Sequence, residues 1–340
     1  MKLTWRRCRV HLKHPFLIAR NRQNSDTGKE VLLIRIEAGG QVGLGEAAPI
    51  SYYRQSLDSA EAMLAQAAGM LGDDPFALDA ILDPINARFP GESAAIAAID
   101  AALHDLVGKL LGVPVWKLLG LDAARVPLTS FTIGLDEPEV VARKTAEAAE
   151  YPILKIKAGT DDDDAILSAV RREAPDKILR VDVNCGWTSA NVLERCRRVM
   201  RYQPEMIEQP TPAGDHGALP GVRAAGVAPL FADESCPGVG DVLGCVGCFD
   251  GINIKLSKCG GIRPAVQMIH TARAAGLKIM LGCMVETSVG IAAAAQLAPL
   301  VDAVDLDGHL LLSDDPFQGI GGAGGRLTLS DRPGLGVTPR

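Results

Sequence analysis

The chain has 340 residues, of which 47% are hydrophobic and 22% charged, so a disordered protein is excluded and a globular fold with a substantial core is expected. The net charge of -6 argues against a nucleic-acid partner. The first residues lack the apolar core of a signal peptide, no apolar run reaches transmembrane length, and the eight cysteines are scattered, so we expect a cytoplasmic protein without membrane contact.

Residues 1–120 predict an α+β unit in which strands precede helices. Residues 31–37 are rich in branched side chains, and Gly39-Gly40 marks a hairpin turn before a returning strand. The candidate strands lie at residues 5–12, 31–37 and 42–46, and the candidate helices at residues 59–71, 75–82 and 93–111.

From about residue 126 the pattern changes to a strict alternation of strand and helix. The candidate strands are residues 128–133, 153–157, 179–183, 206–208, 229–232, 252–256, 278–281 and 303–305, and the candidate helices between them include 137–149, 165–173, 190–201, 265–275 and 289–298. Eight strands with room for a helix in each gap predict a parallel α/β barrel. A doubly wound open sheet is the alternative, but no Gly-x-Gly-x-x-Gly motif opens a helix after a first strand.

Carboxylates recur at the ends of consecutive barrel strands. Asp182, Glu208 and Asp233 follow one another at intervals of 26 and 25 residues, which is one strand–helix repeat. They therefore occupy equivalent positions on the C-terminal rim, where barrel enzymes place their active sites. The alternative is a structural role, in which these carboxylates cap helices or form salt bridges. Convergent carboxylates repel unless a cation lies between them, and oxygen ligands without histidine or cysteine favour Mg²⁺ over zinc.

Lysines flank these carboxylates on both sides. Lys155 and Lys157 are two residues apart on the second strand, so their side chains face the same way, and Lys255 lies on the sixth strand. A lysine acts as a base near neutral pH only if its pKa falls, and a neighbouring ammonium and a dication both lower it. We therefore expect Lys157 and Lys255 on opposite sides of the metal site, with lowered pKa values.

These residues form motifs that resemble the muconate-lactonising subgroup of the enolase superfamily. The motifs are Lys155-x-Lys157, Asp182-x-Asn184, Glu208-Gln209-Pro210, Asp233-Glu234 and Lys255-x-x-Lys258 before Gly260-Gly261. The resemblance covers nearly the whole chain. It implies an α+β capping domain at residues 1–120, a (β/α)7β modified TIM barrel at 121–315, and a C-terminal segment at 316–340 that returns toward the cap.

The resemblance also assigns roles to the rim residues. These are acid–base catalysis for Lys157 and Lys255, metal binding for Asp182, Glu208 and Asp233, and substrate binding for Lys155, Asn184 and Met284. One Mg²⁺ per subunit would stabilise an enediolate, as the superfamily is known to do. Lys258 is a rival to Lys255, but the catalytic lysine of the family corresponds to the first of the two.

The eighth strand ends in Asp305-x-Asp307, two carboxylates that period two places on one face. The pair resembles the Asp-x-Asp of dipeptide epimerases, which holds the N-terminal ammonium of the substrate. The implied reaction is a 1,1-proton transfer at the α-carbon of the C-terminal residue. Epimerases acting on Ala-Glu use an arginine in the loop after the first strand, so Arg20 and Arg22 are both candidates. The resemblance also suggests recycling of cell-wall peptides, and we expect a homo-oligomer.

Other functions remain open on the same scaffold. Muconate cycloisomerase, o-succinylbenzoate synthase and N-acylamino acid racemase would use the same metal and lysines. The cycloisomerase and synthase substrates lack an ammonium, so Asp305 and Asp307 favour the dipeptide. A non-catalytic binding protein is the alternative of another class, and the complete set of lysines and carboxylates argues against it.

Overall fold

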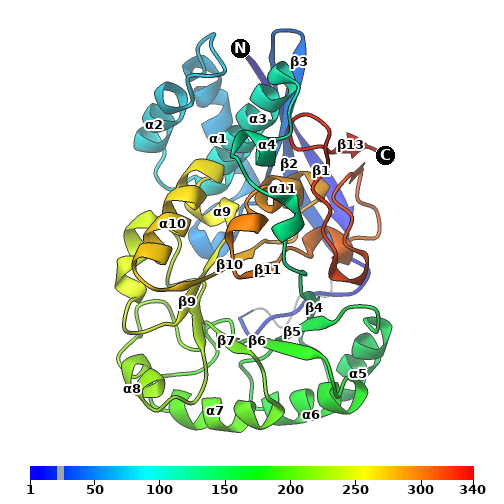
Figure 1. The fold of residues 1–340 in the computed structure, drawn as a ribbon, viewed down its shortest axis with the longest axis vertical. Helices are drawn as coiled ribbons and strands as arrows, with labels where there is room; N and C mark the ends of the chain where they lie inside the picture. Colours follow the sequence, from blue (N-terminus) through cyan, green and yellow to red (C-terminus); the bar gives the residue numbers. More distant parts are fainter. Residues whose placement is uncertain (21–26) are drawn as a thin grey trace.

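The computed structural model describes residues 1–20 and 27–340, and it places an N-terminal domain over one end of a barrel (Figure 1). The N-terminal sheet is antiparallel and consists of β1 (Lys2–His11), β2 (Gly28–Ala38) and β3 (Gln41–Ala47). Gly39 and Gly40 form the β2–β3 turn with φ of +57° and +74°, which a side chain would disfavour. The predicted hairpin is therefore present.

Helices follow the sheet. They are α1 (Leu57–Ala67), α2 (Leu78–Arg88), α3 (Ser93–Leu111) and the short α4 (Val115–Leu118). Of these, α3 packs directly against β2 and β3. Gly43 and Gly45 let β3 approach α3 closely, because a Cβ at these positions would lie 1.9 and 2.0 Å from carbonyl oxygens of α3.

The prediction of a helix at residues 75–82 is wrong in its bounds, because α2 runs through Pro84 to Arg88. Ile81, Leu82 and Ile85 form a buried stripe on one side of this helix. The burial of that stripe outweighs the unfavourable proline.

The described part of the chain from residue 131 onward forms an eight-stranded parallel sheet whose order follows the sequence. Its strands are β4 (Phe131–Ile133), β5 (Ile153–Lys157), β6 (Ile178–Asp182), β7 (Met206–Glu208), β8 (Leu230–Ala232), β9 (Gly251–Ile254), β10 (Lys278–Gly282) and β11 (Ala303–Asp305). A parallel bridge between Thr129 and Val304 brings the first and last strands together. The predicted barrel is confirmed, and the open-sheet alternative is excluded.

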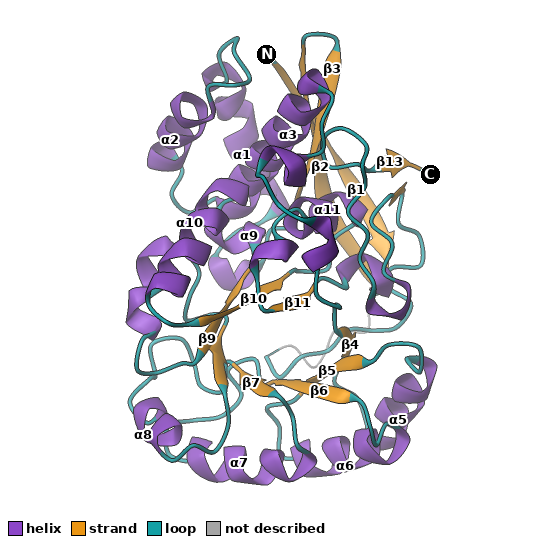
Figure 2. Cartoon of the chain, viewed as in Figure 1, coloured by secondary structure: helices purple, strands orange, loops and turns teal. Residues whose placement is uncertain are grey.

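Helices surround the ring of strands, as Figure 2 shows. They are α5 (Pro138–Glu147), α6 (Asp163–Glu173), α7 (Val192–Val199), α8 (Leu219–Ala224), α9 (Leu256–Cys259), α10 (Ile262–Ala274) and α11 (Ser288–Ala295). Two 3₁₀ turns, Val239–Asp241 and Leu243–Cys245, stand between β8 and β9. In the described residues, no helix is both long and apolar enough to cross a membrane.

The N-terminal domain is joined to the barrel by carboxylates that bind the starts of barrel helices. Asp100 of α3 accepts a hydrogen bond of 2.7 Å from the backbone N–H of Ile262 at the start of α10. Glu46 of β3 accepts one of 2.9 Å from the N–H of Thr287, directly before α11. The positive end of each helix dipole favours this contact. These contacts fix the N-terminal domain over the rim of the barrel.

The end of the chain returns to the N-terminal domain. After β12 (Phe317–Gln318) the chain passes α3 and α4 before it forms β13 (Thr338–Pro339), which pairs with β12. The N–H of Leu335 donates a 2.7 Å hydrogen bond to Asp105 of α3, and the N–H of Val115 donates one of 3.0 Å to the carbonyl of Gly334.

Candidate active site

A cavity of about 350 Å³ lies between the N-terminal domain and the C-terminal rim of the barrel. The N-terminal domain contributes Phe16, Arg20 and Tyr53 to its walls. The barrel contributes residues from several strand ends, and these include every barrel position predicted to bind substrate or transfer protons, together with the predicted metal ligand Asp233. They are Lys155, Lys157, Asn184, Asp233, Lys255, Met284, Asp305 and Asp307.

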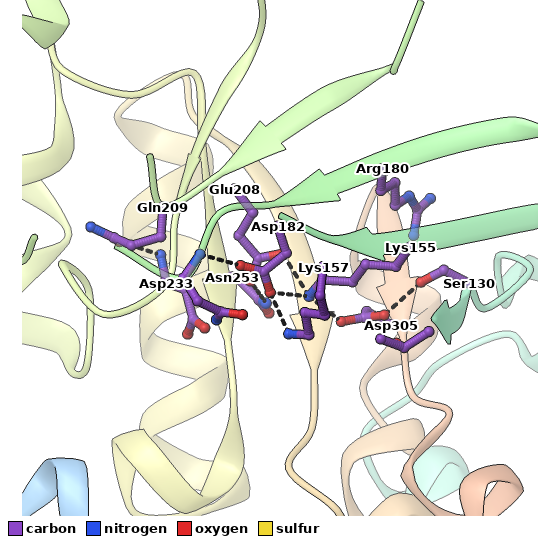
Figure 3. A network of polar contacts seen from close by, with 12 residues as sticks. Ser130, Lys155, Lys157, Arg180, Asp182, Glu208, Gln209, Asp233, Asn253 and Asp305 are labelled. Carbon is purple, nitrogen blue, oxygen red and sulfur yellow. Dashed lines mark hydrogen bonds and ion pairs between the residues drawn. The ribbon is translucent and has the colours of Figure 1, made fainter. Parts of the chain in front are cut away.

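The carboxylates Asp182, Glu208 and Asp233 lie at the same level on neighbouring strands. Asp182 and Glu208 are direct partners in the register of β6 and β7, and Asp233 directly follows β8. All three are buried, with exposed fractions of 0%, 1% and 2%. The strand periodicity therefore brings them together as expected, and Figure 3 shows them side by side.

Lys157 and Lys255 lie on opposite sides of these carboxylates, because β6, β7 and β8 stand between β5 and β9 in the sheet. The Nζ of Lys157 is 2.7 Å from Asp182 Oδ2, and the Nζ of Lys255 is 2.8 Å from Asp233 Oδ2. Lys258 binds the other oxygen of Asp233 at 2.6 Å and also donates to backbone carbonyls of Asp233 and Asn253. Among the described residues lining the cavity are Lys157 and Lys255 but not Lys258.

Lys155 lies at the centre of the buried network. Its Nζ is 3.1 Å from Asp182, 2.7 Å from Glu208 and 2.6 Å from Asp305. Burial would lower the pKa of Lys155, but these three carboxylates together raise it well above its ordinary value. Lys155 is therefore a fixed positive charge at the base of the cavity.

The lowered pKa expected for Lys255 includes the effect of a bound dication, and it stays a prediction. Among the protein groups alone, burial acts to lower the pKa of Lys255, but the carboxylates of Asp233, Glu208 and Glu234 together raise it above its ordinary value. The pKa of Asp233 is held well below its usual range, because Lys255 and Lys258 outweigh the effect of burial.

Several residues that position these groups could not be found from sequence spacing. The side-chain amide of Asn253 donates a 2.7 Å hydrogen bond to Glu208 Oε1. Gln209 Oε1 accepts hydrogen bonds from the N–H groups of Asp233 and Ser235, at 2.9 and 3.0 Å.

Gln209 has a φ of +36°, and Asn184 one of +45°, so the backbone is strained at the ends of both β6 and β7. Such strain is characteristic of functional sites.

The chemistry of the donor set fits Mg²⁺. Asp182, Glu208 and Asp233 offer only oxygen atoms, which Mg²⁺ prefers. Burial, followed by repulsion from Asp182, raises the pKa of Glu208, so its charged form is disfavoured at that position without a further cation. As placed, no group of three or more His, Cys, Asp or Glu side chains in the described residues has the spacing of a metal site. Lys157 and Lys255 instead pair with Asp182 and Asp233.

Asp305 and Asp307 differ in their surroundings. Asp305 is bound by Lys155 and accepts a 2.6 Å hydrogen bond from the hydroxyl of Ser130. Asp307 accepts a 2.6 Å hydrogen bond from the N–H of Thr132, and in the described residues no lysine, arginine or histidine pairs with it. Burial, followed by repulsion from Asp305, raises the pKa of Asp307 to about 6. Asp307 is thus the carboxylate of this pair that can take up a cation.

Arg20 enters the cavity but is already paired. Its Nη2 lies 2.6 Å from Glu234 Oε1, and its guanidinium lies 4.1 Å from the centre of the Tyr52 ring. The second oxygen of Glu234 is buried without a hydrogen-bond partner in the described residues. Arg22, the other candidate from the sequence, lies outside the described residues.

The arrangement of lysines around buried carboxylates, beneath a domain that closes a parallel barrel, defines an acid–base enzyme of the capped-barrel class. Residues 2–120 match the family described as "Mandelate racemase / muconate lactonizing enzyme, N-terminal domain", and residues 139–340 match "Enolase C-terminal domain-like". The chain therefore belongs to the mandelate racemase and muconate lactonizing enzyme family of the enolase superfamily, as the motifs predicted.

Similar proteins align with almost the whole chain. The chain is 41% identical to the L-Ala-D/L-Glu epimerase of Bacteroides thetaiotaomicron, over 99% of this chain and 88% of the relative. It is 37% identical to the L-Ala-D/L-amino acid epimerase of Maribacter, over 99% of each. A crystal structure of a dipeptide epimerase from Enterococcus faecalis, complexed with Mg and L-Leu-L-Tyr, superposes with a TM-score of 0.92, at 33% identity over 99% of both chains.

Proposed function

We propose that this protein is a Mg²⁺-dependent dipeptide epimerase that inverts the α-carbon of the C-terminal residue. The observation that carries the proposal is the placement of Lys157 and Lys255 on opposite sides of a group of buried carboxylates, in one cavity with Asp307. The relatives named as dipeptide epimerases support it. We also propose a domain limit at residue 120, before the barrel strands begin, and another at residue 315, between the last barrel strand and β12.

In this proposal the two lysines exchange protons with opposite faces of the substrate. One of Lys157 and Lys255 is neutral and removes the α-proton, while the other is an ammonium and delivers a proton to the other face. Because the roles exchange between the two enantiomers, the reaction runs in both directions. Lys155 stays charged and attracts the substrate carboxylate toward the base of the cavity.

Asp182, Glu208 and Asp233 would hold one Mg²⁺ per subunit. When bound, the ion supplies positive charge that stabilises the additional negative charge on the substrate carboxylate after α-proton removal. Asn253 and Gln209 orient Glu208 and Asp233 for this task through their hydrogen bonds.

The remaining cavity residues would recognise the two ends of the dipeptide. Asp307, with Asp305 beside it, would bind the N-terminal ammonium. Asn184 and Met284 would contact the dipeptide between its ends. Arg20, or Arg22, would face the side chain of the C-terminal residue; for Arg20 its pairing with Glu234 moderates any preference for an acidic side chain.

The test is exchange of the α-hydrogen of the C-terminal residue in deuterated water, measured by mass spectrometry on a dipeptide library with and without Mg²⁺. We expect Mg²⁺-dependent incorporation of one deuterium together with inversion. Turnover of N-acylated amino acids in preference to free dipeptides would favour an N-acylamino acid racemase. Conversion of muconate or formation of o-succinylbenzoate, with no exchange in any dipeptide, would refute the proposal.

For the cellular setting we propose a cytoplasmic homo-oligomer that acts on cell-wall peptides and binds neither nucleic acid nor membranes. All eight cysteines are free thiols, which suits a reducing compartment. Leu243 and Val246 are exposed at the two ends of one 3₁₀ turn and offer an apolar surface for contact between copies. Light scattering on the purified protein tests the oligomer, and peptide analysis of a deletion strain tests the substrate source.

A further inference from the structure

The ring of strands closes at a thin seam between β4 and β11. In the described residues a single bridge, Thr129 with Val304, joins the start of the barrel to β11, whereas every other pair of neighbouring strands shares at least two positions in register. The N–H of Ser130 donates a 3.1 Å hydrogen bond to the carbonyl of Val304, and the N–H of Leu306 donates one of 2.8 Å to the hydroxyl of Thr129. Because the ladder is so short here, side chains help to hold the end of β11.

Arg180 reaches this seam from across the barrel. It lies on β6, and β5 and β4 stand between β6 and the seam. It is the register partner of Lys155 and is 4% exposed, so its side chain shares the interior of the barrel with that lysine. Its Nη1 donates a 2.6 Å hydrogen bond to the carbonyl of Val304, and its Nε donates to Glu205, directly before β7. Figure 3 shows Arg180 at the end of the polar network that contains Ser130.

A buried arginine is a costly way to fill the interior of a barrel. On the neighbouring strand the register partner of Arg180 is Met206, which belongs to a buried apolar group together with Phe231. An apolar residue of similar volume would fill the same space without the desolvation of a charge. The planar guanidinium offers instead a fixed donor geometry, which here joins the start of β7 to the seam. Its contact with Val304 therefore points to a positioning role.

The peptide bond that Arg180 holds is the one that precedes Asp305. The Oδ2 of Asp305 is 2.6 Å from the Nζ of Lys155, and its Oδ1 accepts a 2.6 Å hydrogen bond from the hydroxyl of Ser130. In the proposed function Lys155 attracts the substrate carboxylate. A shift of the carbonyl of Val304 would displace Asp305, and with it the ammonium of Lys155, from the geometry that the reaction needs.

We infer that Arg180 is a positioning residue, which fixes Asp305 through the carbonyl of Val304 and thereby orients Lys155 toward the substrate. The inference rests on the proposed function and deepens it. Arg180 itself is not among the residues that line the cavity, so it acts through these contacts and not on the substrate.

Arg180→Met removes the donors and keeps the bulk. We expect kcat/KM to fall about tenfold for free and N-acetylated dipeptides alike, mostly through KM, because Lys155 binds the carboxylate that both substrates carry. The same substitution made in Asp305→Asn should change kcat/KM by less than about twofold, because the residue through which Arg180 acts is already altered. In a crystal structure of Arg180→Met, the distance from Asp305 to Lys155 should lengthen by about 0.5 Å or more.

Three variants serve as controls. Glu205→Gln keeps an oxygen that accepts from Arg180, so the contact with Val304 remains and kcat/KM should stay within about twofold of the wild-type value. Phe231→Leu disturbs packing in the barrel interior without touching the seam, and it should change kcat/KM by the same factor with and without Asp305→Asn. Arg180→Lys keeps a charged donor and should recover part of the activity lost in Arg180→Met.

The outcomes separate this inference from the proposed function. If the wild-type protein exchanges the α-hydrogen of no dipeptide, the proposed function fails, and the crystal structure of Arg180→Met still decides whether Arg180 positions Asp305. An unchanged distance from Asp305 to Lys155 would overturn the inference. So would a full tenfold loss on adding Arg180→Met to Asp305→Asn, or an equal loss in Glu205→Gln. Should Arg180→Met not fold, Arg180→Gln takes its place in each measurement.

Discussion

The assignment of Asp307 to the substrate ammonium gives the sharpest prediction. Asp307 is 3% exposed and has no cationic partner among the described residues, so a bound ammonium would be its counter-charge. Loss of one partner from a buried ion pair costs about 3–5 kcal/mol, and a cavity open to water reduces this to about 2 kcal/mol. N-acetylation of the dipeptide should therefore lower kcat/KM about thirtyfold.

Asp307→Asn tests the same contact from the protein side. Asparagine keeps an oxygen that can accept the hydrogen bond from Thr132, so the fold is preserved while the charge is lost. We expect kcat/KM for free dipeptides to fall about thirtyfold and the advantage over acetylated ones to vanish. Asp305→Asn removes the charge that pairs with Lys155 and should lower kcat/KM for both substrates alike.

The pH dependence of this advantage follows from the raised pKa of Asp307, which is about 6. The carboxylate attracts an ammonium only when it is ionised, so the preference for free over acetylated dipeptides should shrink as pH falls below about 6. Bound ammonium lowers that pKa, so kcat should change at lower pH than kcat/KM. Equal turnover of free and acetylated dipeptides by the unmodified enzyme would refute the assignment.

Other variants test the remaining roles. Lys157→Ala and Lys255→Ala should each abolish epimerisation but leave α-hydrogen exchange from one enantiomer, whereas exchange lost from both enantiomers in each variant would contradict the two-base arrangement. Lys258→Ala removes a buried partner of Asp233 and should lower Tm more than Lys255→Ala, as thermal unfolding measures. Removal of Mg²⁺ with EDTA should abolish exchange, and added Mg²⁺ should restore it and raise Tm. Burial raises the pKa of Glu46 to about 7 despite its hydrogen bonds from Thr287 and Gly290. The contribution of the protonated carboxyl to the free energy of unfolding is therefore full below about pH 4.5 and is lost as pH rises through about 7, a change of about 3 kcal/mol. Glu46→Gln should therefore reduce the difference in Tm between pH 5 and pH 8.

The barrel could be predicted because each strand is a short apolar run with turn residues on both sides. Burial on both faces leaves the same signal in every repeat, and the equal spacing of Asp182, Glu208 and Asp233 fixes the rim. The helix α8 was missed because its six residues include Pro220 and Gly221, which have low helix propensity. The bounds of α2 were wrong because packing of its buried stripe overrides the local effect of Pro84.

Period and spacing predicted which residues reach the rim, but not how their charges are compensated. Compensation depends on contacts between segments far apart in the chain, such as Lys155 with Asp305 at a separation of 150 residues and Glu46 with Thr287 at 241. Sequence reasoning treated Asp305 and Asp307 as equivalent, because both lie on one face of one strand. Lys155 distinguishes them, since it neutralises Asp305 and leaves Asp307 available. In the proposed function, recognition of an ammonium would therefore depend on Lys155, which lies on another strand and pairs with only one of the two carboxylates.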